Sequence, residues 1–115
     1  MENASPQKPG PHDSLVLTLQ CRAENLPDLF PSRLLVEKGR RFDLELETRS
    51  SDGTFISVIE KCDRPLSHNE EGTAILRVAV PKTHSLFFVE GSRVKLRHAQ
   101  YVIANCDVVK IERPR

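Results

Sequence analysis

The chain of 115 residues is long enough for one domain with its own hydrophobic core. Hydrophobic residues make up 38% of it and charged residues 29%, which excludes a largely disordered chain. The net charge of +1 excludes general affinity for polyanions, but it conceals an asymmetry. Residues 1–80 carry ten basic and thirteen acidic side chains, whereas residues 81–115 carry seven basic and three acidic ones. The chain can therefore present a local basic face.

The N-terminal segment differs in composition from the rest of the chain. Met1–Asp13 is polar and contains three prolines, so we expect residues 1–13 to form a flexible tail without a secretory signal. Residues 14–115 are expected to form a single β-barrel domain. The longest apolar runs span only four residues, so no contact with a membrane is predicted.

The cysteines, histidines and glycines show no spacing that is typical of catalysis or metal binding. The three cysteines, at positions 21, 62 and 106, are far apart, which predicts reduced thiols in an intracellular protein, nuclear or cytoplasmic. The histidines lack metal-ligand spacing, and Gly39, Gly53, Gly72 and Gly91 are expected to be isolated turn residues. Nothing supplies an oxyanion hole or an orienting carboxylate for a nucleophile. We therefore expect no enzyme activity, no metal and no cofactor.

The first half of the chain predicts three strands. Ser14–Cys21 is rich in Leu and Val and is followed by a loop with one helical turn near Leu26–Phe30. Phe42–Thr48 alternates strictly between apolar and polar residues, which indicates a half-buried strand. Asp52-Gly53 provides a turn with positive φ into the return strand Thr54–Lys61.

The second half predicts further strands. Thr73–Val80 is a strand that ends before a proline, and Lys82–Val89 is a short bridge. Arg93–His98 alternates basic and apolar residues, and we expect this strand to be continued or bulged as far as Asn105, which breaks it. Asp107–Arg113 is then the last strand.

The sequence V-E-G-S-R-V-K-L-R-H-A, residues 89–99, resembles the way OB-fold domains enter their fourth strand. In those domains an acidic residue and a glycine make a tight turn before a Val/Leu alternation with charged partners. The resemblance covers roughly residues 35–113 and implies an all-β fold, a small five- or six-stranded Greek-key barrel. It also implies a helix between strands three and four, which here must be short and lie within Pro81–Phe88. An immunoglobulin-like β-sandwich is a more distant alternative, and the absence of Trp counts against its antibody-type version.

The resemblance also implies a function. OB-fold domains commonly bind single-stranded DNA or RNA on the face of strands two and three, with cations along the phosphates and flat side chains stacked on the bases. The chain would then be a non-enzymatic module of a genome-maintenance, telomere or RNA-handling complex with protein partner subunits. The candidate nucleic-acid-binding residues are Arg40, Arg41, Arg49, Phe55, Lys61, Arg64 and Arg77.

The sequence leaves two questions open. The basic row Arg93/Lys95/Arg97 could track phosphates, or it could form a charge ladder with Asp43/Glu45/Glu47, because the first and fourth strands of an OB barrel are neighbours. The alternative function is a protein-protein interaction domain on a β-barrel or β-sandwich scaffold without nucleic-acid binding. Phe87-Phe88 would contribute to such a contact, since two consecutive residues of an extended segment cannot both face one core.

Overall fold

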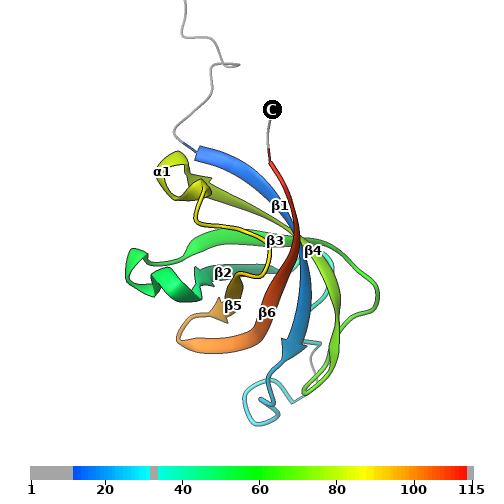
Figure 1. Cartoon of the computed structure of the whole chain (residues 1–115). Helices are drawn as coiled ribbons and strands as arrows, with labels where there is room; N and C mark the ends of the chain where they lie inside the picture. Colours follow the sequence, from blue (N-terminus) through cyan, green and yellow to red (C-terminus); the bar gives the residue numbers. More distant parts are fainter. Residues whose placement is uncertain (1–11, 32–33, 114–115) are drawn as a thin grey trace, which may run out of the picture.

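Six antiparallel strands close into one barrel in a computed structural model of the chain, which describes residues 12–31 and 34–113 (Figure 1). Around the barrel the strands follow the order β1-β4-β3-β2-β5-β6. Their bounds are β1 His12–Ala23, β2 Arg41–Leu46, β3 Phe55–Cys62, β4 Glu71–Pro81, β5 Arg93–His98 and β6 Tyr101–Glu112. This architecture confirms the predicted all-β barrel and is compatible with an OB-like one.

The N-terminal strand β1 closes the barrel, because it pairs with both β4 and β6. The OB-like resemblance begins near residue 35 and so leaves β1 out. Within the resemblance, β2 and β5 correspond to the predicted first and fourth strands, and they are neighbours as expected. β1 begins at His12, two residues earlier than predicted, and residues 1–11 of the expected tail lie outside the described residues.

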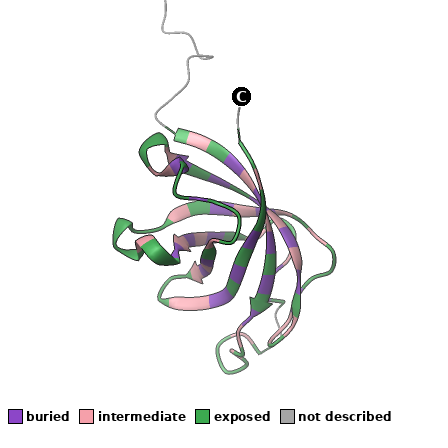
Figure 2. Ribbon diagram, in the orientation of Figure 1, coloured by how far each residue is buried: buried purple, intermediate pink, exposed green. Residues whose placement is uncertain are grey.

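Alternation along the strands fills the barrel with apolar side chains (Figure 2). In β1, for example, Leu15, Leu17 and Leu19 are fully buried and the residues between them are half-buried. Phe88, which follows α1, is also fully buried, whereas Phe87 is 42% exposed. This difference confirms that the two consecutive phenylalanines do not share the core.

Short helical segments lie at one end of the barrel. η1 Glu47–Asp52 joins β2 to β3, and α1 Lys82–Ser85 joins β4 to β5. The strand predicted over Phe42–Thr48 therefore ends at Leu46, while α1 falls in the interval where the resemblance implied a short helix. Within residues 12–31 and 34–113, no helix has the length and apolar character needed to cross a membrane.

The break predicted at Asn105 is wrong. Asn105 lies inside β6 and faces solvent, where its side-chain amide donates to the carboxylate of Glu24. The chain reverses earlier, in the turn Ala99-Gln100, where Ala99 adopts a positive φ of 54°. Sequence patterns miss this turn because positive φ is uncommon outside glycine and a few polar residues.

Gly72 was also expected in a turn, but it is buried within β4. A Cβ at this position would lie 2.9 Å from Cδ2 of Leu66, the buried residue that covers this end of the barrel. Leu66 is held there by backbone hydrogen bonds with Leu35 and Val36. Gly72 thus allows a loop to pack closely onto the barrel.

Candidate functional site

Three of the predicted binding residues meet on the outer face of the barrel. Arg41, the first residue of β2, and Arg77 on β4 line one hollow together with Ile56 of β3. Arg40, which directly precedes β2, lines a second hollow with Arg41. Lys61, near the other end of β3, is exposed and lies outside both hollows. The barrel therefore brings these three arginines onto one surface.

Three adjoining hollows form this surface, and Arg41 lines all of them. Together they cross β4, β3, β2 and β5. The hollow around Lys38 and Arg41 holds about 350 Å³, near the lower limit of small-ligand pockets, and it is open to solvent. The shape suits an extended ligand lying across the strands. We call this region the Arg41 surface. Its cations, exposed apolar group and ring are Lys38, Arg40, Arg41, Arg77, Arg97, Ile56 and His98, and the carboxylates of Glu37 and Asp43 line it as well.

Ion pairs neutralise part of the positive charge on the Arg41 surface. Three of its arginines lie 2.6 to 3.5 Å from carboxylates: Arg77 from Glu60, Arg97 from Glu45 and Arg40 from Glu37. The hydrogen bond from Arg77 to Glu60 raises the pKa of Arg77 above its usual value. Among the described residues, Lys38 and Arg41 make no ion pair. These two cations are therefore the ones left to meet an external anion.

Apolar and aromatic groups accompany the cations. Ile56 on β3 lines the same hollow as Arg41 and Arg77 and is 71% exposed. His98, at the end of β5, is exposed, and its ring meets the edge of Phe30 with centroids 6.3 Å apart. A flat ring of this kind can stack on a nucleic-acid base.

The sequence prediction did not include Lys38, Ile56 or His98 in the site. A signal was present for the first, because Lys38 belongs to the run K-G-R-R, which has three cations in four residues. A signal was also present for Ile56, because the predicted strand Thr54–Lys61 has apolar residues on both faces and one of these faces must point to solvent. His98 was overlooked although its strand was expected beside β2, because the end of β5 was placed beyond His98 and its exposure at the strand end was not anticipated.

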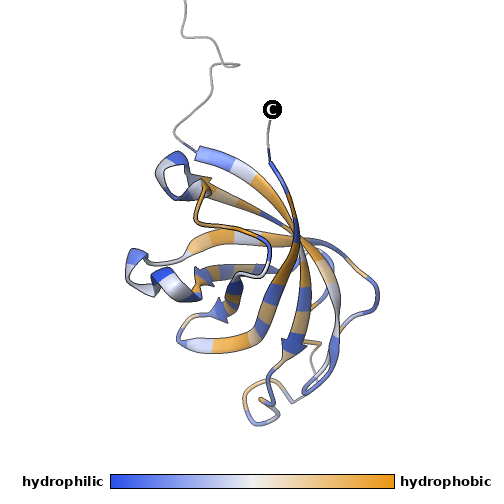
Figure 3. Ribbon diagram, in the orientation of Figure 1, coloured by the Kyte–Doolittle hydropathy of each residue, from blue (hydrophilic) through white to orange (hydrophobic). Residues whose placement is uncertain are grey.

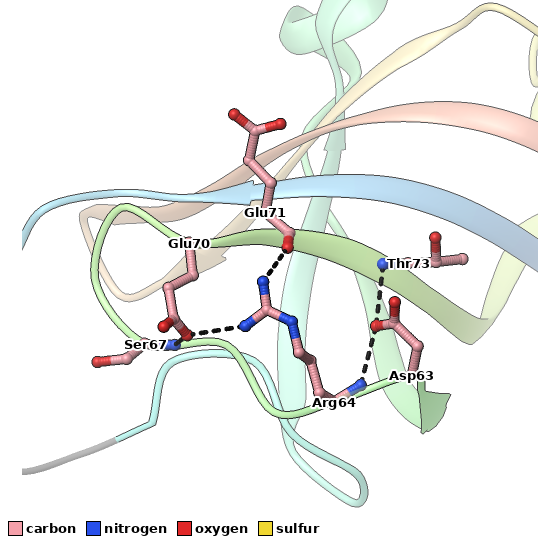
Figure 4. Close-up of polar contacts among 6 residues, drawn as sticks. All are labelled: Asp63, Arg64, Ser67, Glu70, Glu71 and Thr73. Carbon is pink, nitrogen blue, oxygen red and sulfur yellow. Dashed lines mark hydrogen bonds and ion pairs between the residues drawn. The ribbon is translucent and has the colours of Figure 1, made fainter.

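Arg64, another predicted binding residue, is engaged in the loop between β3 and β4 (Figure 4). Its guanidinium donates to the backbone oxygen of Glu71 at 2.7 Å and lies 3.3 Å from the carboxylate of Glu70. Beside it, the Asp63 carboxylate accepts hydrogen bonds from the backbone N–H groups of Arg64 and Thr73. Through these contacts Arg64 stabilises the loop between β3 and β4.

Phe55, the predicted stacking residue, lies at the barrel end that holds η1 and α1. Its ring packs edge to face against buried Phe88, with centroids 6.1 Å apart, and lies 5.9 Å from the ring of His84. The side chain is half-buried. This packing separates Phe55 from the Arg41 surface.

Arg49 lies at the same end and is held by two neighbours. Its Nε donates to the carboxylate of Asp52 at 2.7 Å, and its guanidinium carbon lies 3.8 Å from the ring centroid of Phe87. The same carboxylate lies 3.4 Å from Nε2 of His84 on α1. These contacts connect η1 to α1, and the Arg49 guanidinium already has an anionic and an aromatic partner within the protein. We call the group Arg49, Asp52, Phe55, His84 and Phe87 the α1 end.

Beside the α1 end, the first part of the connection from α1 to β5, residues 86–89, is apolar and, apart from buried Phe88, exposed. Figure 3 shows this part as hydrophobic. Leu86 is 78% exposed and Val89 is 52% exposed. Arg113 fixes the segment, since its guanidinium donates to the backbone oxygens of Ser85 and Phe88. The loop therefore presents apolar side chains from a fixed backbone.

The basic row on β5 lies beside carboxylates. The strand registers give three opposed pairs: Asp43 with Arg97, Glu45 with Lys95, and Arg93 with Asp107 of β6. The Nη1 atom of Arg97 also lies 3.3 Å from Oε1 of Glu45. Glu47 lies beyond the strand, in η1. The arrangement is a charge ladder, and Arg97 in addition lines the Arg41 surface.

Within the described part of the chain, no group of three or more His, Cys, Asp or Glu side chains is placed to hold a metal ion. No protein-family model matches the chain, and no curated protein sequence matches it significantly.

Proposed function

We propose that the chain is a non-enzymatic module that binds single-stranded DNA or RNA across the Arg41 surface. We place it in an intracellular assembly, nuclear or cytoplasmic, that handles genomic DNA, telomeres or RNA. The observation that carries the proposal is the position of Lys38 and Arg41. Both are cations without a carboxylate partner among the described residues, and both line a surface that crosses four strands.

The dimensions of the surface support this proposal. Neighbouring strands lie about 4.8 Å apart, so the distance from β4 across β3 and β2 to β5 is roughly 15 Å. This length suits a few nucleotides, the lower part of the range that one OB-like barrel occupies. Lys38 and Arg41 would contact the phosphates first, and Arg77 and Arg97 would join them where a phosphate competes with their carboxylate partners, while Ile56 and His98 would contact bases.

The proposal predicts salt-dependent binding. Titration of fluorescently labelled oligo-dT and oligo-U at two salt concentrations should give affinities that fall steeply as salt is raised, because phosphate binding releases counterions. Absence of binding at protein concentrations on the order of 100 μM would overturn the proposal, since non-specific contacts already register at this level. A preference for one of the two oligomers would decide between DNA and RNA.

A charge reversal localises the binding. Arg41→Glu should weaken oligonucleotide binding by about tenfold or more, because it removes one cation and adds a repulsive charge. Lys110→Glu is the matched control, since Lys110 is exposed on β6, the strand across the barrel from β3. Equal losses in the two variants would show that binding follows net charge and not the Arg41 surface.

A second candidate function is protein interaction through the exposed loop that follows α1. The supporting observation is that Leu86, Phe87 and Val89 are exposed together on a loop that Arg113 fixes. A contact of the barrel with another copy of itself would appear in light scattering as a mass that rises with concentration. Leu86→Asp should then restore the monomer mass, whereas a constant monomer mass in both proteins would exclude self-association.

A further inference from the structure

Two of the three cysteines lie face to face inside the barrel. Cys21 on β1 is opposite Cys106 on β6, and their Sγ atoms are 3.0 Å apart. Both side chains are buried, with 1% and 4% exposure. The third cysteine, Cys62, is half-buried on β3, which lies across the barrel from β6.

The backbone already has the geometry of a disulfide. Directly opposed residues of an antiparallel pair have Cα atoms about 4.5–5.5 Å apart, within the range of about 4.4–6.8 Å found across disulfides. Closing the bond from the present separation requires the two sulfur atoms to approach by about 1 Å. A side-chain rotation can supply a movement of this size without displacing β1 or β6.

We propose that Cys21 and Cys106 form an oxidation site that peroxide converts into a disulfide joining β1 to β6. One thiol loses its proton as its sulfur attacks a peroxide oxygen; the O–O bond breaks, the departing hydroxide takes up that proton to become water, and a sulfenic acid remains. The sulfur of the second thiol then attacks the sulfenic sulfur, the S–S bond forms, the S–O bond breaks, and the departing hydroxide takes the second thiol's proton to become a second water. Two thiols thus lose two electrons and two protons, and one hydrogen peroxide becomes two waters. A dithiol reductant reverses the reaction by exchange.

The surroundings make this oxidation slow and selective. The hydrogen bond with Cys21, together with burial, raises the pKa of Cys106 well above its usual value, so Cys106 retains its proton. Peroxide is small enough to reach a buried thiol that larger oxidants do not reach. Because the partner thiol is already in contact, the sulfenic acid is captured before further oxidation.

The disulfide would act on the strand that closes the barrel. It encloses most of the chain between Cys21 and Cys106, and a long enclosed loop constrains the unfolded state strongly. It would also keep β1 in place between β4 and β6. The oxidised protein should therefore have a Tm higher by on the order of 10 °C.

The experiment uses the full chain with Cys62→Ser, which removes the competing thiol, and the unchanged chain beside it. Each protein is incubated for a long period with hydrogen peroxide, unfolded, treated with iodoacetamide and analysed by mass spectrometry. We expect no alkylation of either remaining cysteine in Cys62→Ser, a cross-linked Cys21–Cys106 peptide, and recovery of both thiols after dithiothreitol. In the unchanged chain the same Cys21–Cys106 cross-link should form, and Cys62 should carry no cross-link.

Two results would overturn the proposal. The first is full alkylation of both cysteines after peroxide treatment, and the second is accumulation of sulfinic acid or of a cross-link to Cys62. Cys106→Ser, oxidised in the same way, should lose the cross-link and the rise in Tm together. Because the decisive result comes from the Cys62→Ser protein, a folding defect in the Cys106 variant does not affect it.

Discussion

The Arg41 surface and the α1 end both combine arginines with rings, but they use them differently. At the α1 end, Arg49 is held between Asp52 and the ring of Phe87. On the Arg41 surface, Arg41 has no carboxylate partner among the described residues, and the nearby ring of His98 is exposed. The first arrangement stabilises the barrel end, and the second leaves groups available to a ligand.

This difference gives the two regions separate roles in our proposals. A single strand needs cations for its phosphates and rings for its bases. Of these two regions, the Arg41 surface is the one whose described cations include some without an internal ion pair, although it has few rings. The α1 end has the rings, but the apolar loop beside it suits a protein partner better than a phosphate chain. Separate variants can therefore test the two regions independently.

The largest effect is expected at Phe88. Phe88→Ala should lower the free energy of unfolding by about 3–5 kcal/mol, because it leaves a cavity where a fully buried ring packs against Phe55. Phe87→Ala is the matched control and should cost less than about 1 kcal/mol, the value of its contact with Arg49. Urea denaturation measures both. Similar losses in the two variants would contradict the separation of these neighbouring rings.

Phe55→Ala tests whether the two regions are independent. Because the ring is half-buried against Phe88, we expect the free energy of unfolding to fall by about 1.5–3 kcal/mol. Oligonucleotide affinity should remain unchanged as long as the protein is folded. A loss of affinity in a folded variant would mean that the α1 end belongs to the binding site and that Phe55 stacks on a base, as the sequence predicted.

His98→Ala tests the ring on the Arg41 surface. If a base stacks on His98, the substitution should weaken oligonucleotide binding by about 1–3 kcal/mol. His84→Ala is the control, because His84 is a histidine of the α1 end and lies outside the hollows of the Arg41 surface. Fluorescence titration of both variants at one salt concentration gives the comparison. An unchanged affinity of His98→Ala would restrict the surface to phosphate contacts.

The strands could largely be predicted from the sequence. The start of β5 at Arg93 was predicted correctly, because its alternation follows a turn at Gly91 with positive φ, whereas its end at His98 was missed. The start of β6 could not be predicted, because Ala99 makes its turn without the residues that usually signal one. Local patterns thus reveal strands well, and they reveal turns only where the turn residue is typical.

The candidate site was less predictable, because the sequence shows a cation but not its partner. Arg77 pairs with Glu60 on the neighbouring strand, and that contact depends on the register of β3 and β4. Arg64 pairs within its own loop, yet its bond to the backbone of Glu71 has no sequence signature. The cations most relevant to binding are those that have no carboxylate partner in the folded barrel. Which cations these are depends on how all the strands pair, so the sequence alone does not reveal them.

The smallest effect concerns Arg97, which belongs to both the charge ladder and the Arg41 surface. A double-mutant cycle with Glu45→Ala and Arg97→Ala should give a coupling energy of about 0.2–1 kcal/mol in the free energy of unfolding, as partly exposed pairs do. Arg97→Ala should also weaken oligonucleotide binding if Arg97 contacts a phosphate. Lys95→Ala is the control, since Lys95 lies in the same row but outside the hollows of the Arg41 surface. Coupling without any loss of binding would make β5 a purely structural strand and would limit the phosphate contacts to Lys38, Arg41 and Arg77.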